Sequence, residues 1–207
     1  MSALYEIEDG GDYYLLRLVS PDGTNRLTRA CVLALTDCLK DLAGGNVPLI
    51  VAGNSKFFSA GADLSEIAAL SAPQAYEFAM MGQKLMNAIE GFPARVYACI
   101  EGYCFGGGLD LALACRHRIA TPHAIFGHRG AALGLITGWG GTQRLPRLIG
   151  KGKALQMFVA AEKIHAAEAL RIGLVDTIAV EPIAAAIQKI KRIHHGDTGV
   201  QRRRSEH

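Results

Sequence analysis

Residues 102–110, GYCFGGGLD, decide the fold, because three consecutive glycines separate a strand pattern from a helix pattern. The apolar run at 96–100 precedes them, and apolar residues at the spacing of a short helix follow from Leu109 to Cys115. Glycine has no β-carbon, so this turn can bring a ligand against the main chain. The free N–H groups at the start of the helix would then face that ligand. By itself, the triplet is more typical of a tight packing turn.

A second glycine-centred turn, FSAGADL at residues 58–64, changes that interpretation. It follows the apolar run at 47–52 and precedes another helix pattern, so we expect each turn to follow directly from a buried strand. Two neighbouring turns of this kind would each present a backbone N–H to one point. Such a pair of donors forms an oxyanion hole, which stabilises the charge that develops on a carbonyl oxygen. The pair therefore predicts a site for a carbonyl group such as a thioester.

Strand and helix patterns alternate along the rest of the chain. Tyr14, Leu16 and Leu18 alternate as in a strand, and apolar residues at 27–38 recur at helical spacing before a stop at Gly44 and Gly45. A long helical stretch opens at residue 73 and closes near residues 91–93. This alternation predicts an α/β fold. With 207 residues, of which 50% are hydrophobic, the chain fits one domain with a well-filled core.

Composition and charge exclude several classes of protein. No apolar stretch has the length of a membrane span, and the first residues do not resemble an export signal. The five cysteines are odd in number and form no C-x-x-C pair, which is typical of the reducing cytoplasm. The net charge of +3 lies largely in the basic run at 202–204, so no basic stripe indicates nucleic-acid binding. We therefore predict a cytoplasmic protein that binds neither membranes nor nucleic acids.

Other candidate sites are weaker. Cys104 lies beside the glycine triplet, but a free cysteine in an apolar segment is more typical of a small core residue than of a nucleophile. His117, His123 and His128 match no common zinc spacing, so we predict surface or loop histidines and no metal. The GKGK segment at 150–153 lacks the spacing of a phosphate loop and predicts a junction between helices. No G-x-G-x-x-G motif indicates a dinucleotide.

The two turns are followed by GGTQRLPR at 140–147, AAEA at 166–169 and GLVD at 173–176. Together these blocks resemble the crotonase superfamily of enoyl-CoA hydratases and isomerases, from about Tyr5 to Val180. The resemblance implies a spiral of ββα turns with two roughly perpendicular sheets flanked by helices, assembled as trimers or hexamers. It implies an acyl-CoA-binding core at 1–180, followed at 181–207 by a shortened C-terminal helix, Pro182 to Ile193, and a basic polar tail.

The same resemblance assigns roles to individual residues. It places the two oxyanion donors on the backbone N–H groups of Ala62 and Gly107. Coenzyme A is implied as part of the substrate, so no separate cofactor is expected. The coenzyme A loop comprises Ser59, Ala60, Gly61, Ala62, Asp63 and Leu64.

The acid–base positions depart from the family pattern. Hydratases of the family use two glutamates, whereas this chain has Asp110 at the first position and Gly130 at the second. Glycine cannot transfer a proton, so the two-glutamate mechanism cannot operate. Asp110 is one methylene shorter than glutamate, and it is either the proton-transfer residue or a first-turn carboxylate that stabilises its helix. The possible pocket residues are Gly106, Gly130, Thr137 and Trp139.

The loop around Gly130 allows a further interpretation. Gly130 and the GWG segment at 138–140 are similar to the dihydroxynaphthoyl-CoA synthase branch, in which some members bind bicarbonate in place of the second carboxylate. Thr137 stands where that branch has an aspartate, so the similarity is partial. His128, Arg129 and Thr137 are candidates to hold an anion or water, but ordinary loop residues are the favoured interpretation.

These observations predict an acyl-CoA enzyme that stabilises an enolate and adds water to a 2-enoyl-CoA. The alternatives within the superfamily are double-bond isomerisation, decarboxylation and thioester hydrolysis, because one fold hosts several reactions. The alternative class is a non-catalytic acyl-CoA binding protein, which the missing second carboxylate favours.

Overall fold

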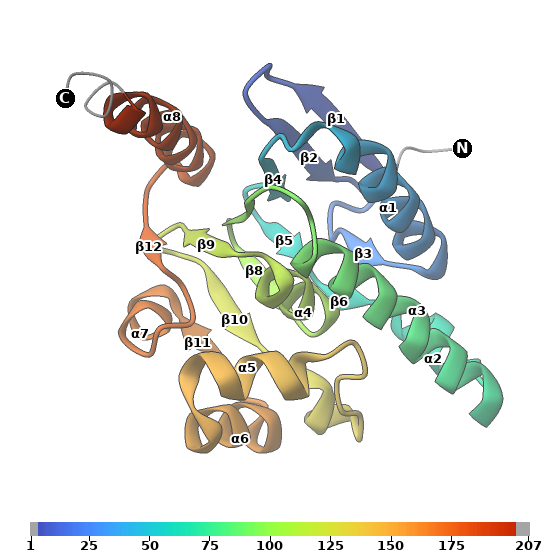
Figure 1. Ribbon diagram of the computed structural model, residues 1–207. Helices are drawn as coiled ribbons and strands as arrows, with labels where there is room; N and C mark the ends of the chain where they lie inside the picture. Colours follow the sequence, from blue (N-terminus) through green and yellow to red (C-terminus); the bar gives the residue numbers. More distant parts are fainter. Residues whose placement is uncertain (1–3, 202–207) are drawn as a thin grey trace.

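The computed structural model describes residues 4–201, and side chains up to residue 193. Three successive strand–strand–helix units form its centre (Figure 1). The first strands of the units are parallel neighbours in a six-stranded sheet: β4 (Leu49–Ala52), β7 (Val96–Ile100) and β9 (His117–Ala120). The second strands are parallel neighbours in a four-stranded sheet: β5 (Phe57–Ser59), β8 (Tyr103–Phe105) and β10 (Ile125–Gly127). Two sheets flanked by helices confirm the predicted α/β fold of ββα units.

Shorter and antiparallel strands complete the sheets. The six-stranded sheet has the order β1-β2-β4-β7-β9-β12, and the four-stranded sheet has the order β11-β10-β8-β5. A third sheet pairs β3 (Arg26–Leu27) in parallel with β6 (Gly61–Ala62). The remaining strands are β1 (Tyr5–Asp9), β2 (Tyr14–Leu18), β11 (Ile164–His165) and β12 (Thr177–Ile178).

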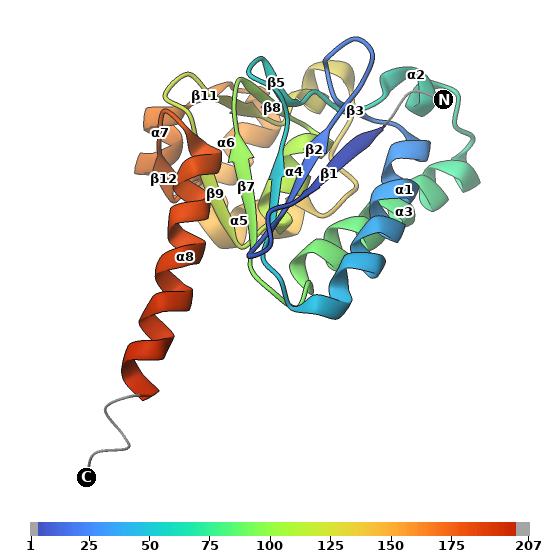
Figure 2. The same ribbon diagram turned by 90° about the horizontal axis from the view of Figure 1, so that it is seen from above.

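Two long helices pack side by side against one face of the six-stranded sheet (Figure 2). The first, α1 (Arg29–Leu42), begins where the Thr28 side chain accepts a hydrogen bond from the Cys31 N–H. It leads into the short 3₁₀ helix η1 (Ala43–Gly45). The second, α3 (Ala72–Glu90), begins with a capping box of Ser71 and Gln74 and ends before Gly91. Both predicted helical stretches are confirmed.

The opposite face of this sheet is covered by the first part of α8 (Pro182–Gln201). Successive residues of a strand face opposite sides, so Leu49 and Val51 of β4 pack in the larger core while Ile50 faces α8. The far part of α8 extends away from the sheets (Figure 2). The predicted helix Pro182 to Ile193 was therefore too short, because the polar residues after 193 continue the helix without an apolar face to mark it. The basic run at 202–204 lies outside the described residues.

Shorter helices complete the described part of the fold. Gly150, with a φ of +85°, joins α5 to α6, which confirms the predicted helix junction. These helices are α2 (Leu64–Ala68), η2 (Arg129–Leu133), α5 (Gly141–Ile149), α6 (Lys151–Ala160) and α7 (Ala166–Arg171).

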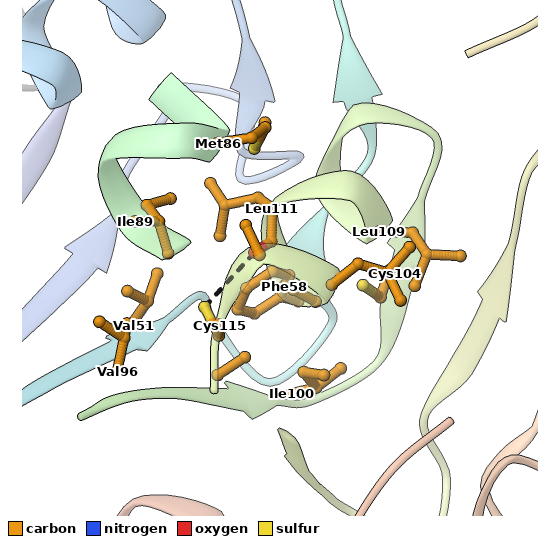
Figure 3. Close-up of a cluster of buried hydrophobic side chains, with 14 of the residues drawn as sticks. Val51, Phe58, Met86, Ile89, Val96, Ile100, Cys104, Leu109, Leu111 and Cys115 are labelled. Atoms are coloured by element: carbon orange, nitrogen blue, oxygen red, sulfur yellow. Dashed lines mark hydrogen bonds between the residues drawn. The ribbon is translucent and has the colours of Figure 1, made fainter. Parts of the chain in front are cut away.

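A short central helix, α4 (Gly107–Ala114), is buried on all sides. Figure 3 shows its Leu109 and Leu111 packed among Phe58, Ile100 and other apolar side chains from both sheets. Each fully buried Leu or Phe side chain stabilises the fold by about 1.5–3 kcal/mol. The cluster therefore fixes the position of α4 and of the turn at its N-terminus.

Cys104 belongs to this core and not to an exposed reactive site. Its side chain is fully buried, and this burial raises the thiol pKa well above its ordinary value. A protonated thiol is a poor nucleophile. The interpretation of Cys104 as a small core residue agrees with this position.

Candidate active site

The two glycine turns meet where the second sheet ends. A β-carbon added to Gly61, which has a φ of +96°, would lie 2.7 Å from the Phe105 carbonyl oxygen and 3.0 Å from the Gly107 nitrogen. One added to Gly107 would lie 3.3 Å from the Ala62 nitrogen. The two main chains therefore approach as closely as glycine allows, which brings the backbone amides of Ala62 and Gly107 together.

The route from strand to turn differs from our expectation. We expected the buried strands at 47–52 and 96–100 to lead directly into the turns, but β5 and β8 lie between. These strands have only three residues each, too few to show a periodic pattern in the sequence. Because β5 and β8 pair with each other, they place the two turns side by side.

Gly107 is the first residue of α4, after Gly106 with a φ of +51°. The Gly106 N–H donates to the Gly127 carbonyl oxygen at 3.0 Å, which ties the turn to the end of β10. The first N–H groups of a helix have no acceptor within the helix, and they carry the positive end of its dipole. The start of α4 therefore favours a negatively charged oxygen at Gly107.

A cavity of about 440 Å³ opens onto this point. Most of its walls are apolar, with a small number of polar groups, which is typical of a small-molecule site. It is bordered by residues of both turns and of the loop before α5: Ala60, Ala62, Leu64, Gly106, Gly107, Asp110, His128, Gly130, Thr137 and Trp139. All four predicted pocket residues are among them.

A larger hollow of about 730 Å³ lies elsewhere, beside Pro48, Arg95 and Arg116. These residues precede β4, β7 and β9, so this hollow lies at the N-terminal ends of the parallel strands. Ligands of open α/β sheets bind beyond the C-terminal ends. The smaller cavity, which contains the predicted site residues, is therefore the candidate active site.

Two members of the predicted coenzyme A loop hold the loop in place. The Ser59 hydroxyl, which is fully buried, donates to the Asn25 carbonyl oxygen at 2.7 Å and accepts from the Gly61 N–H at 3.1 Å. Neither Ser59 nor Gly61 borders the cavity. They fix the backbone of the loop, while Ala60, Ala62 and Leu64 form the cavity wall.

Asp63 acts on the helix that follows the loop. Its carboxylate caps α2 by accepting from the N–H groups of Ser65 at 2.8 Å and Glu66 at 3.2 Å. It also contacts Arg26 at 3.0 Å. The hydrogen bond from the Ser65 hydroxyl is the main cause of a lowered Asp63 pKa, so this carboxylate stays ionised.

Asp110 lies in the first turn of α4 and borders the cavity, although its side chain is only 1% exposed. The Thr137 hydroxyl donates to Oδ2. Oδ1 has no hydrogen-bond partner among the described residues and lies 3.4 Å from Nε2 of His128. Burial raises the Asp110 pKa to about 7, although the Thr137 hydrogen bond and the Arg144 charge oppose this shift. A carboxyl group with this pKa can both accept and donate a proton near neutral pH.

His128 is a correction to the sequence analysis. We predicted a surface or loop histidine; the residue does lie in a loop, but its side chain is only 4% exposed and packs against Phe158, with ring centroids 5.1 Å apart. Burial lowers its pKa to about 4, so the ring is neutral at pH 7 and its contact with Asp110 is not an ion pair. His128 directly follows β10, at the end of the sheet where ligands bind. This position after a strand was the signal in the sequence that we missed.

Thr137 lies in a loop and borders the cavity, as predicted, and its hydroxyl also donates to Asp110, which the sequence did not indicate. Gly130 lies in η2, where an added β-carbon would be 2.8 Å from the Leu135 carbonyl oxygen. The present backbone therefore accepts no side chain at 130. Arg129, the first residue of η2, borders the cavity and is exposed.

Trp139 forms the wall behind the glycine triplet. Its side chain is 3% exposed, and its indole N–H donates to the Phe78 carbonyl oxygen at 3.2 Å. A β-carbon added to Gly107 would lie 2.5 Å from the indole ring, and one added to Gly82 of α3 would lie 2.1 Å from it. Trp139 thus fills the space that two glycines leave open.

Two absences within the described residues bear on other classes of site. No cluster of three or more His, Cys, Asp or Glu side chains that could hold a metal ion was found among them. Within residues 4–201, no helix is long and apolar enough to cross a membrane. The absence of a metal remains a prediction.

Comparison with known sequences gives a consistent result. A sequence model of the enoyl-CoA hydratase/isomerase family matches residues 13–195. A crotonyl-CoA hydratase of Syntrophomonas wolfei is 38% identical over 182 residues, which are 86% of this chain and 69% of that protein. A probable enoyl-CoA hydratase of Bacillus subtilis is 41% identical over 172 residues, or 82% of this chain and 66% of that protein. The match thus spans about two thirds of these relatives' lengths.

Solved structures show the same fold. The chain superimposes on an enoyl-CoA hydratase of Bacillus anthracis with a TM-score of 0.87 and 33% identity, covering 93% of this chain and 77% of that one. It superimposes on DspI of Pseudomonas aeruginosa with a TM-score of 0.89 and 34% identity, covering 94% and 81%. Its two sheets and helices therefore follow an arrangement seen in experimental structures.

Proposed function

The chain belongs to the enoyl-CoA hydratase/isomerase family, and we propose that it is an acyl-CoA enzyme that adds water to a 2-enoyl-CoA. One observation carries the proposal: Ala62, Gly107 and Asp110 border the same cavity. The names of the relatives, crotonyl-CoA hydratase and probable enoyl-CoA hydratase, support the same reaction.

In this proposal, the thioester oxygen of the substrate accepts hydrogen bonds from the N–H groups of Ala62 and Gly107. Negative charge develops on that oxygen as water adds to C3, because the electrons of the C2–C3 double bond move toward the carbonyl group. Donors that are already in place stabilise this charge without reorganisation. Loss of one such donor typically costs about 3–4 kcal/mol in the transition state.

Asp110 transfers the proton. Its carboxylate takes a proton from water as the oxygen of that water forms a bond to C3, and an enolate results. The Asp110 carboxylic acid then returns the proton to C2, and the thioester carbonyl group forms again. One water is added and no net proton is consumed. The raised Asp110 pKa, about 7, supports both halves of this cycle.

The coenzyme A portion of the substrate lies along residues 59–64, where Ala60 and Leu64 border the cavity. The hydrogen bonds of Ser59 and the helix cap of Asp63 support this role, because they hold the loop in one conformation before the substrate binds. No separate cofactor is needed for this chemistry.

Double-bond isomerisation is the second candidate. Asp110 is the sole carboxyl group among the described residues that border the cavity, and isomerisation needs one base that moves a proton between carbons. Decarboxylation, thioester hydrolysis and non-catalytic binding of acyl-CoA remain alternatives, because a fold by itself does not specify a reaction.

Assembly and location are part of the proposal. We infer a homotrimer or hexamer, supported by exposed apolar side chains on α6: Leu155 is 63% exposed and Val159 is 70% exposed. Apolar surface of this kind marks protein contacts. A cytoplasmic location is supported by five free cysteines, all buried.

The test is turnover of crotonyl-CoA by the purified chain, followed as loss of the absorbance of the conjugated thioester. The Asp110→Asn variant, which preserves the side-chain shape, should lose about 10²–10⁴-fold in turnover while still binding the thioester. A 3-enoyl-CoA is assayed in parallel. Turnover of that compound alone would replace hydration by isomerisation, and binding without turnover of either compound would indicate a binding protein.

A further inference from the structure

Three buried polar atoms at the base of the cavity have no hydrogen-bond partner among the described residues. They are Oδ1 of Asp110 and both ring nitrogens of His128. A buried polar group without a partner is costly, so native proteins rarely retain one without a function. Oδ1 of Asp110 and Nε2 of His128 face each other at 3.4 Å, slightly beyond an ordinary hydrogen bond.

We propose that His128 is a positioning residue for Asp110, and that its Nε2–H donates to Oδ1 while the Thr137 hydroxyl donates to Oδ2. This inference rests on the proposed function for its role in the reaction. Hydrogen bonds of catalytic groups are often long without substrate and shorten when substrate binds. The two donors would hold the carboxylate by both oxygens and leave the remaining lone pairs for water.

The surroundings of the pair favour this arrangement. The His128 ring is neutral, so its Nε2 can carry the proton while Nδ1 does not. Phe158 packs against the ring from α6 and restricts its rotation. Arg144 is the charged group that lowers the Asp110 pKa, and it is already bound to Glu90 at 2.6 Å and to Asn87 at 2.8 Å. His128 is therefore the available donor for Oδ1.

Because Gly141, the first residue of α5, has no side chain, there is space for Asp110 and His128 to meet. A β-carbon added there would lie 2.1 Å from Oδ1 of Asp110 and 3.0 Å from Nε2 of His128. No side chain fits at this position without displacing the pair. Three segments, α4, the end of β10 and the start of α5, therefore converge on the same contact.

The hydrogen bond from His128 to Asp110 matters for proton transfer, because the second glutamate of the family is absent from this chain. A donor on Oδ1 stabilises the ionised carboxylate, which is the form that takes a proton from water. Without His128, the carboxyl group would hold its proton to higher pH and would rotate about its side-chain bond. Substrate binding would change little, since the thioester contacts the backbone amides on the other side of the cavity.

The experiment compares three substitutions of His128. His128→Gln places an amide N–H near the Nε2 position, whereas His128→Leu has no donor and the amide of His128→Asn is too short to reach Oδ1. His123→Gln is the matched control, because His123 is exposed and does not border the cavity. The Asp110 pKa is measured by NMR titration of ¹³C-labelled aspartate, with the signal assigned by its loss in Asp110→Asn.

We expect His128→Leu and His128→Asn to raise the Asp110 pKa by about one unit, a tenfold change in its ionisation constant. They should lower kcat about tenfold, with KM for crotonyl-CoA within about twofold of the native value. His128→Gln should bring both the Asp110 pKa and kcat most of the way back to their native values, and His123→Gln should change neither the pKa nor kcat. A merely structural histidine would not give this selective rescue by glutamine.

Two results would overturn the inference: an Asp110 pKa that is unchanged in the variants without a donor, or His128→Gln behaving like His128→Leu. The short polar His128→Asn variant keeps the test decisive if the leucine variant does not fold. The NMR titration needs no turnover. Failure of the hydration assay would therefore reject the proposed reaction while the contact between His128 and Asp110 is still tested.

Discussion

The two sides of the cavity are built in different ways. We call residues 60–62 and 105–107 the backbone side, and Asp110, His128 and Thr137 the side-chain side. The backbone side depends on two turns in which glycine permits close contact of main chains. The side-chain side joins one residue from each of three separate segments, through contacts at Oδ1 and Oδ2 of Asp110. A turn that requires glycine can therefore be recognised in the sequence, whereas a contact between residues of distant segments produces hardly any local sequence pattern.

The largest effect is expected on the backbone side. Gly107→Pro removes the N–H of the first residue of α4, a position where proline is tolerated. Gly107→Ala is the matched control, because it adds the same β-carbon against Trp139 and keeps the N–H. Turnover of crotonyl-CoA should be about 10²–10³-fold lower in the proline variant than in the alanine variant. Equal turnover in the two variants would mean that the Gly107 N–H is not a donor to the transition state.

A smaller effect, on stability, is expected on the side-chain side. Asp110 has a pKa of about 7 in the folded protein and an ordinary value of 3.8, so the folded state holds a proton that the unfolded state releases between these values. The free energy of unfolding therefore falls as the pH rises from about 4 to 7. Asp110→Asn removes this term. Between pH 4 and pH 8, the free energy of unfolding of the variant should therefore rise by about 2–4 kcal/mol relative to that of the native protein.

Urea unfolding of both proteins at the two pH values measures this difference. The pKa of His128 is lowered to about 4 in the folded protein, so His128 lowers the free energy of unfolding of both proteins as the pH falls. This effect is common to both proteins and cancels, to first order, in the difference between them. A difference in unfolding free energy that does not depend on pH would show that Asp110 is not held at a raised pKa.

The fold was largely predictable, and the reasons lie in particular elements. The helices at Arg29–Leu42 and Ala72–Glu90 have clear apolar periodicity and end near glycine. The strands at Leu49–Ala52 and Val96–Ile100 are continuous apolar runs. β5 and β8 were missed because three residues give no period. The end of α8 was misplaced because its last residues have no apolar face to mark them.

The site was predictable only in part. The backbone turns around Gly61 and Gly107 were predicted because only glycine permits their close contact. The burial of His128 and its contact with Asp110 were not predicted, since they depend on how α4, β10 and α5 converge. Thr137 was predicted as a pocket residue, but its hydrogen bond to Asp110 was not. The catalytic roles of Ala62, Gly107 and Asp110 stay predictions.

The pH dependence of kcat/KM for crotonyl-CoA hydration, measured from pH 5 to pH 9 in the native protein and in Asp110→Asn, tests the central claim most directly. Because the ionised carboxylate is the base, activity of the native protein should rise with pH and level off above about 7, the Asp110 pKa. The variant should have little activity and no such rise. A native profile that is flat through pH 7, together with full activity of Asp110→Asn, would contradict the account.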